Sequence, residues 1–320
     1  MPFSRIIGHD RIIAILRRSL TAKRMAHAYL FHGIDGCGMK ETALAFVEAV
    51  FCNGVEGCGA CPSCRKVAGE RHPDLHIVSP DGSFIKIDQI RDLQKELSYR
   101  PFEARIKACI IEDADRMNPA AANAFLKTLE EPPGDALLIL LTSHFDGLLP
   151  TILSRCQQLR FPPLSTETIV SHLRENGAEE EEARIAAALA DGSLERAKEA
   201  LAGDRLQARR LLLERVAGLS SREIIPLFAA AEELARDKES ALDVVDILRL
   251  FWRDVLLMHA GSSDITNSDL RHLVRQTAER TSQERVMEKL ERISRVRQAL
   301  TRNANPRLSA EVLFMELADS

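Results

Sequence analysis

Long apolar segments are missing from the sequence. No run approaches the ~18 residues that a membrane-spanning helix requires, and residues 1–12 lack the long apolar stretch of a signal peptide. The chain also has no fixed-period repeat and no low-complexity segment, which argues against a solenoid. We therefore expect a cytoplasmic protein that does not enter a membrane.

An excess of one charge is missing as well. The 43 basic and 47 acidic side chains leave a formal net charge of −4, so no global attraction toward nucleic acid is expected, although local basic patches remain possible. The 45% apolar and 28% charged content is ordinary for a soluble globular protein. At about 100–200 residues per domain, a chain of 320 residues predicts two or three domains.

Short apolar runs alternate with helical patterns through residue 164. The runs predict strands at residues 29–32, 75–79, 106–111, 137–142 and 158–161. Periodic spacing of apolar residues predicts helices at residues 11–20, 40–51, 87–97 and 119–130. This alternation is typical of an α/β fold with a parallel sheet, and we expect one such domain at residues 1–164.

Strand patterns disappear after residue 164, and helical periodicity replaces them. Helices are expected at residues 166–176, 179–190, 194–202 and 204–217, separated by glycine-containing breaks. Further helices, typical of a bundle, are expected at residues 223–236, 241–259, 268–280, 282–303 and 309–318. The sequence thus predicts a small helical domain at 165–218 and a C-terminal helical domain at 219–320.

The first predicted strand runs into a glycine-rich loop that contains Gly33, Gly36 and Gly38 and precedes a helix. This is the context of a phosphate-binding loop, in which backbone N–H groups and a helix N-terminus hold phosphates. The next two positions should be Lys and then Ser or Thr, but they are Met39 and Lys40. Three interpretations stay open: no nucleotide, weak binding of ATP and Mg²⁺ through Lys40 and Thr42, or an unrelated turn.

Two acidic residues, Glu112 and Asp113, follow the predicted strand at 106–111. The carboxyl end of a strand beside a phosphate loop is where a magnesium-holding carboxylate and a water-polarising carboxylate belong. Here the order is swapped, with Glu112 in the metal-holding position. The alternative is a solvated acidic turn before the helix that follows Asn118.

Four of the seven cysteines fall within thirteen residues: Cys52, Cys58, Cys61 and Cys64. Zn²⁺ prefers four tetrahedral ligands in a structural site, and Cys-x2-Cys spacing lets a tight turn place two sulfurs on one ion. Structural zinc is the favoured interpretation, while unligated thiols and an iron–sulfur cluster stay open. The remaining cysteines are expected to be small buried residues.

Several longer motifs stand beside the loop at Gly33 and the four-cysteine insertion: residues 6–9 (IIGH), 111–117 (IEDADRM), 123–133 (NAFLKTLEEPP), 154–156 (SRC) and 303–308 (NANPRL). Together these features resemble the AAA+ clamp-loader subunits of bacterial DNA polymerase III, and within them the delta prime branch. The resemblance implies an AAA+ P-loop module with a zinc insertion at 52–64, a helical lid and a C-terminal helical collar.

The resemblance also implies a function. A subunit of this kind sits in a five-membered ring with motor subunits of the gamma/tau type and a delta-type subunit, and the ring uses ATP to load a sliding clamp on primed DNA. Arg155 would be the arginine finger for the neighbour's ATP, and Thr142 and Ser143 match a sensor-like polar pair. Glu195 stands where motor subunits carry a lid arginine, which favours lost or weakened ATP use. The alternative is a catalytically active motor-type ATPase of the same family.

Overall fold

The structure is a computed structural model that describes residues 2–52, 54, 56–132, 134–217, 237–262, 265–302 and 304–318. The helix expected at residues 223–236, the domain boundary expected at 218/219, and the motif residues Pro133 and Asn303 lie outside this described part. Two compact units are present. Unit one comprises Met1–His172 and Asp191–Glu195, and unit two comprises Leu173–Ala190 and Arg196–Ser320. The division into three domains stays a prediction.

A five-stranded parallel sheet forms the centre of unit one, in the order β2-β3-β4-β1-β5. All residues of β3 and β4 are buried, as expected for parallel strands that are covered on both faces. The five predicted strands are confirmed, with each end shifted by one residue at most. The strands are β1 (Ala28–Gly33), β2 (Leu75–Val78), β3 (Lys107–Ile111), β4 (Ala136–Thr142) and β5 (Gln157–Phe161).

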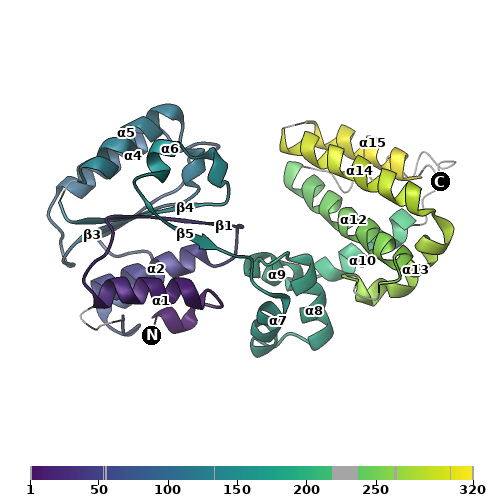
Figure 1. The fold of residues 1–320 in the computed structure, drawn as a ribbon, viewed down its shortest axis with the longest axis horizontal. Helices are drawn as coiled ribbons and strands as arrows, with labels where there is room; N and C mark the ends of the chain where they lie inside the picture. The colour runs from purple at the N-terminus through teal and green to yellow at the C-terminus, as the bar shows by residue number, and fades with distance from the viewer. Residues whose placement is uncertain are drawn as a thin grey trace. The chain divides into compact units, whose positions relative to one another are not determined.

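Helices cover both faces of the sheet (Figure 1). On one face lie α1 (Asp10–Thr21) and α2 (Met39–Phe51), and on the other lie α4 (Ile87–Ser98), α5 (Pro119–Glu130) and α6 (Pro150–Leu153). Alternate strand residues point to opposite faces, so a single strand contributes to both cores. In β1, Tyr29 and Phe31 contact the first core, while Ala28 and Leu30 contact the second.

Capping explains why α5 matches its predicted bounds. The side chain of Asn118 accepts a hydrogen bond from the backbone N–H of Ala121 at 2.8 Å, and Pro119 occupies the first helical position. By contrast, α3 (Pro62–Ala68) and α6 were not predicted, because helices of seven and four residues are too short to display a period. Three short 3₁₀ turns complete unit one, at Pro2–Arg5, Ala114–Arg116 and Phe145–Gly147.

All described elements of unit two are helical, and α7 and α9 each cross from one unit to the other. A core that includes Leu248, Phe251, Ile293 and Phe314 holds the C-terminal helices together. Among the described residues, no helix is long and apolar enough to span a membrane. The helices are α7 (Thr166–Glu175), α8 (Glu180–Leu189), α9 (Leu194–Leu201), α10 (Arg205–Ala217), α12 (Lys238–His259), α13 (Arg271–Arg280), α14 (Gln283–Thr301) and α15 (Pro306–Ala318), with a 3₁₀ turn at Ser268–Leu270.

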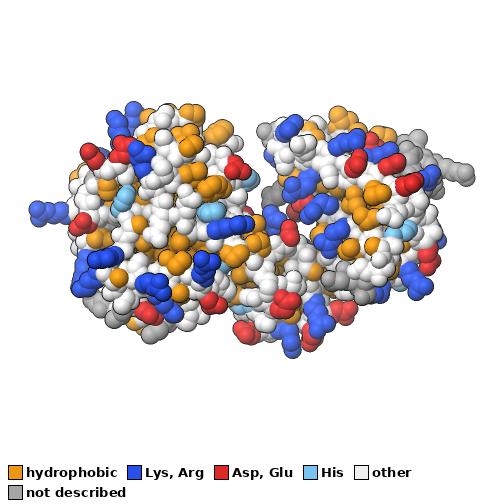
Figure 2. Space-filling view, viewed as in Figure 1, with side chains coloured by type: hydrophobic (Ala, Val, Ile, Leu, Met, Phe, Trp, Pro, Cys, Tyr) orange, Lys and Arg blue, Asp and Glu red, His pale blue; other side chains and the backbone are white. Residues whose placement is uncertain are grey.

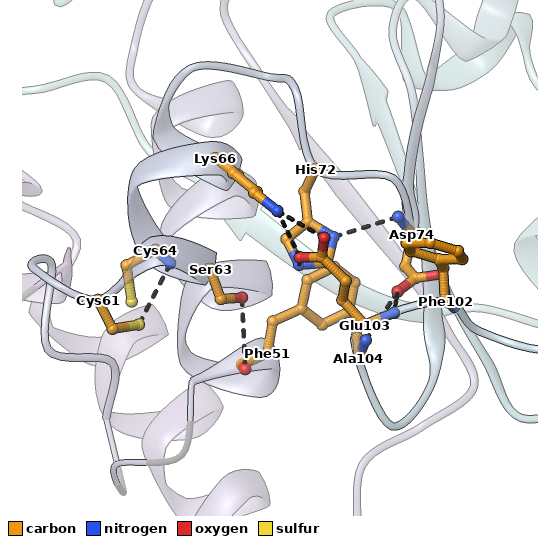
Figure 3. Close-up of polar contacts among 10 residues, drawn as sticks. All are labelled: Phe51, Cys61, Ser63, Cys64, Lys66, His72, Asp74, Phe102, Glu103 and Ala104. Carbon is orange, nitrogen blue, oxygen red and sulfur yellow. Dashed lines mark hydrogen bonds and ion pairs between the residues drawn. The ribbon is translucent and has the colours of Figure 1, made fainter.

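A buried carboxylate organises the turn that leads into β3 (Figure 3). Asp74, 1% exposed, accepts hydrogen bonds from the backbone N–H groups of Phe102, Glu103 and Ala104 at 2.6–2.7 Å. Burial by itself raises the pKa of a carboxyl group, but these three donors outweigh it and lower the pKa of Asp74. The ionised form is therefore the one that the fold stabilises.

Replacing Asp74 by Asn should destabilise unit one by about 1–3 kcal/mol at neutral pH, because the amide NH₂ faces N–H donors. Since the folded-state pKa lies below the unfolded value, the carboxylate's contribution is complete above about pH 4 and is lost as the pH falls further. Urea unfolding followed by circular dichroism, with hydrogen exchange at residues 102–104, should show a difference from wild type that shrinks at low pH. The matched control is Asp92→Asn, an exposed carboxylate, and an equal effect in both variants would contradict this account.

Candidate functional site

The phosphate-type loop lies at the carboxyl end of β1, where ligands of open parallel α/β sheets bind. Gly38 precedes α2 with φ +106°, a left-handed conformation that glycine adopts without strain. Because neighbouring strands run parallel, Glu112 after β3 and Thr142 at the end of β4 come to the same edge of the sheet. The sequence-predicted candidates for nucleotide chemistry are thus brought together.

Lys40 is engaged by two carboxylates of its own chain. Its Nζ lies 2.8 Å from Oε1 of Glu112 and 2.9 Å from Oε1 of Glu70, which follows α3. Burial acts to lower the pKa of Lys40, but the contacts with Glu112 and Glu70 outweigh it and raise the pKa. No sequence signal marked Glu70, since it lies thirty residues from Lys40 and outside every motif. The ammonium group is therefore neutralised inside unit one.

Two residues near Lys40, Met39 and Thr42, also make contacts within the chain. Thr42 is fully buried, and its hydroxyl donates to the carbonyl oxygen of Gly38 at 2.7 Å, as a helical Thr commonly does. Met39, at the position where a phosphate-binding lysine belongs, is 7% exposed and packs in the core under α1 and α2. The hydroxyl of Thr42 is thus used in a hydrogen bond within α2, and the Met39 side chain is used in core packing.

Glu195 lies directly against the loop. Its backbone N–H donates to the carbonyl oxygen of Gly36 at 3.2 Å, and a Cβ added to Gly36 would come within 2.7 Å of the Cβ of Glu195. Gly36 itself has φ +70°, so both its conformation and its surroundings require glycine. The segment thus brings a carboxylate, in place of the lid arginine that the resemblance implies for motor subunits, beside a loop that would have to hold phosphate.

Asp113 of the acidic pair, and Asp115 near it, make contacts within the chain. Asp113 has φ +46° and lies 3.4 Å from Arg116; burial raises the pKa of Asp113, and Arg116 opposes this rise. Its neighbour Asp115, which the sequence did not single out, accepts a hydrogen bond from the hydroxyl of Thr142 at 2.5 Å. Thr142 is 1% exposed, whereas Ser143 is half-buried and contacts His144. Thr142 is therefore already committed to a partner.

Arg155 lies at the opposite end of the sheet from the phosphate loop. It precedes β5, whose first residue Gln157 pairs with Tyr29, whereas the loop follows Gly33 at the other end of β1. At ~3.3 Å per residue, the separation of four residues between Tyr29 and Gly33 corresponds to about 13 Å. Arg155 is thus placed away from the loop of its own chain.

Three contacts hold the Arg155 side chain, which is 35% exposed. Its Nη2 lies 2.5 Å from Oε1 of Glu130, and its Nη1 donates to the carbonyl oxygen of Thr151 at 3.0 Å and to the hydroxyl of Ser154 at 3.3 Å. Glu130 belongs to the LEEPP segment that carries the resemblance, but no local pattern marks it as a partner of Arg155.

The four clustered cysteines meet in space. Their sulfur atoms all lie within 4.8 Å of one another, and two of the pairs, Cys52 with Cys61 and Cys58 with Cys64, are 4.0 Å apart. Tetrahedral zinc with bonds of about 2.3 Å needs sulfurs about 3.8 Å apart, so the cluster is compatible with a structural ion. Backbone N–H groups of Ala60 and Cys61 donate to the sulfur of Cys58 and lower its pKa to about 6, whereas burial raises the pKa of Cys64 to about 12. The thiolate that metals bind is thus favoured at Cys58 alone of these two.

Contacts beyond the cysteines tie this insertion, residues 52–64, to the rest of unit one (Figure 3). Lys66 of α3 lies 2.5 and 2.6 Å from the two carboxylate oxygens of Glu103, in the turn that Asp74 organises. His72 accepts a hydrogen bond from the N–H of Asp74 and lies against the ring of Phe51, so it is a packed residue outside the sulfur cluster. The helix α3, which begins within the insertion, is therefore tied to the turn that Asp74 organises by the ion pair between Lys66 and Glu103.

Basic and acidic side chains are interspersed on the face drawn in Figure 2, over both units. Neither sign gathers into a broad patch on this face. The small net charge of the chain thus reflects, on this face, a mixture of single basic and acidic side chains.

Comparison with known proteins identifies relatives over nearly the whole chain. A family model described as DNA polymerase III, delta subunit, matches residues 8–165, and one described as DNA polymerase III, delta subunit, C terminal, matches residues 203–318. The DNA polymerase III subunit delta' of Bacillus subtilis is 32% identical and covers 97% of this chain and 96% of its own. The subunit delta' of Escherichia coli K12 is 30% identical, with 88% and 85% coverage.

The fold comparison agrees. A DNA polymerase III gamma subunit-related protein from Thermotoga maritima superimposes with a TM-score of 0.57 at 23% identity, over 96% of this chain and 98% of that one. A structural likeness at 23% identity supports only the fold. The family assignment rests on the family models and on the relatives found by sequence. The chain belongs to the family of DNA polymerase III delta prime subunits.

Proposed function

We propose that this chain is a clamp-loader subunit that takes part in ATP-dependent loading of a sliding clamp on primed DNA during replication. In this role it donates Arg155 to the ATP bound by a neighbouring motor subunit of the gamma/tau type and does not turn over ATP itself. The assembly would be the five-membered ring that the family resemblance implies, with a delta-type subunit as a further member. DNA would be met inside the ring through helix N-termini and local basic residues that bind phosphates, and not through base reading.

The observation that carries the proposal is the separation of Arg155 from the phosphate loop of its own chain. Arg155 precedes β5 at the amino end of the sheet, and the loop lies at the carboxyl end. An arginine so placed can serve a nucleotide only if that nucleotide belongs to another subunit. There a planar guanidinium would stabilise charge that develops on the γ-phosphate and its equatorial oxygens.

The state of the loop itself supports the second part of the proposal. Lys40 is paired with Glu112 and Glu70, Thr42 donates to Gly38, and Glu195 lies against Gly36. A nucleotide would have to break the lysine pairs and approach a carboxylate. We infer that ATP and Mg²⁺ bind this subunit weakly or not at all, and that the insertion holds structural zinc through Cys52, Cys58, Cys61 and Cys64.

Arg155→Ala should sharply reduce ATP hydrolysis at the adjacent motor site of the reconstituted complex. Arginine fingers contribute ~10³–10⁵ to the rate at the site they serve, so this site's share of the DNA-stimulated rate should disappear. Arg155→Lys should stay impaired, because a lysine keeps the charge but lacks the planar fork. Steady-state hydrolysis by the complex with primed DNA is the measurement. Full activity of Arg155→Ala in a correctly assembled complex would rule out the finger role.

The isolated chain should bind ATP with Mg²⁺ only weakly and should not hydrolyse it. Titration calorimetry at constant ionic strength measures the affinity, with a motor-type subunit as the positive control. The retained acidic pair, Glu112 and Asp113, is the feature that favours the rival function, a motor-type ATPase that tolerates the shifted Lys40. Micromolar affinity together with turnover by the lone chain would favour that rival.

Cys61→Ser should lower the metal content of the purified chain and destabilise the insertion, because a structural zinc site contributes its binding free energy to folding. Elemental analysis distinguishes zinc from iron, and an iron–sulfur cluster would also absorb visible light. The control is Cys109→Ser or Cys156→Ser, since both cysteines lie outside the sulfur cluster. A metal content equal to wild type in Cys61→Ser would contradict ligation by that residue.

A further inference from the structure

We propose that Glu130 is a positioning residue for Arg155, which it orients before the neighbouring subunit's nucleotide arrives. The inference rests on the proposed function of Arg155 and adds a second residue to it. Its starting observation is the ion pair between Nη2 of Arg155 and Oε1 of Glu130, at 2.5 Å.

The fold places both residues at one edge of the sheet. Glu130 is the last residue of α5, which leads into β4, and Arg155 follows α6 and leads into β5. Because β4 and β5 are parallel to β1 between them, the segments that enter them lie at the same, amino end. The pair therefore joins two segments 25 residues apart in sequence on the side away from the phosphate loop.

The contacts hold the guanidinium of Arg155 in place but leave some of its N–H donors unused. Nη1 donates to Thr151 and Ser154, and Nη2 faces Glu130, so the planar group is held from two directions. A guanidinium carries five N–H donors, and the three contacts leave donors for a phosphate. An arginine held in one orientation loses less conformational freedom when it engages its target than one that moves freely.

Exposure decides whether the carboxylate orients the arginine or withholds it. The side chains of Arg155 and Glu130 are 35% and 50% exposed, and ion pairs that contact water to this extent are weak. A nucleotide phosphate carries more negative charge and accepts two parallel N–H bonds from arginine. Phosphate would therefore outcompete Glu130, which leaves orientation as the role that the pair can fill.

The test compares Glu130→Ala, Glu130→Gln and the matched control Glu131→Gln in the reconstituted complex. Glu131 is the adjacent exposed carboxylate, and it has no ion pair within the described part of the chain. Glu130→Ala should lower the adjacent motor site's share of kcat for DNA-stimulated ATP hydrolysis about two- to fivefold, the range expected for an exposed ion pair, with the KM for ATP unchanged. Glu130→Gln should be intermediate because its amide oxygen still accepts from Nη2, and Glu131→Gln should match wild type.

A second readout does not depend on catalysis. Side-chain ¹⁵N NMR of the isolated full-length chain should show restricted rotation of the Arg155 guanidinium in wild type and Glu131→Gln, and free rotation in Glu130→Ala. In an Arg155→Ala background, Glu130→Ala should have no further effect on kcat. Wild-type kcat in Glu130→Ala, an increase in kcat, or an undiminished effect in the Arg155→Ala background would each overturn the positioning role. If Arg155→Ala alone leaves hydrolysis unchanged, the finger role fails first, and the NMR result still reports the ion pair by itself.

Discussion

The common direction of the five strands is the constraint on which the functional arrangement of unit one depends. Because all pairings are parallel, every strand begins at one edge of the sheet and ends at the other. The glycine loop and the acidic residues after β3 share the carboxyl edge, while Glu130 and Arg155 share the amino edge. One sheet therefore keeps the glycine loop and the partly exposed Arg155 at opposite ends of its strands.

At the carboxyl ends of the strands, the groups around the glycine loop contact other residues of the same chain. Lys40 is held between Glu112 and Glu70, and Glu195 approaches Gly36 so closely that no larger residue fits there. These contacts retain the geometry of a phosphate loop, including the left-handed Gly38 and the helix that follows it. Lys40 and the hydroxyl of Thr42 therefore already have partners within the chain.

The helix that ends the cysteine insertion is linked to Lys40 beside the glycine loop and to the turn before β3. This helix, α3, is followed by Glu70, which pairs with Lys40, and it carries Lys66, which pairs with Glu103. Glu103 in turn lies in the turn that the buried Asp74 holds through backbone hydrogen bonds. A metal held by the four sulfurs would close a loop of thirteen residues and stabilise the start of α3. Loss of that metal would therefore also weaken the ion pairs of Glu70 and Lys66.

The sequence by itself determined the features that depend on neighbours along the chain. Continuous apolar runs predicted the five strands to within one residue, the cap at Asn118 predicted α5, and four cysteines within thirteen residues predicted the cluster of sulfurs. Only the tertiary structure decided which groups are already engaged. Lys40 pairs with Glu70, Arg155 pairs with Glu130, and the N–H of Glu195 bonds to Gly36, across 30, 25 and 159 residues. Contacts at such separations leave no periodic or local pattern in the sequence, because tertiary folding brings the segments together.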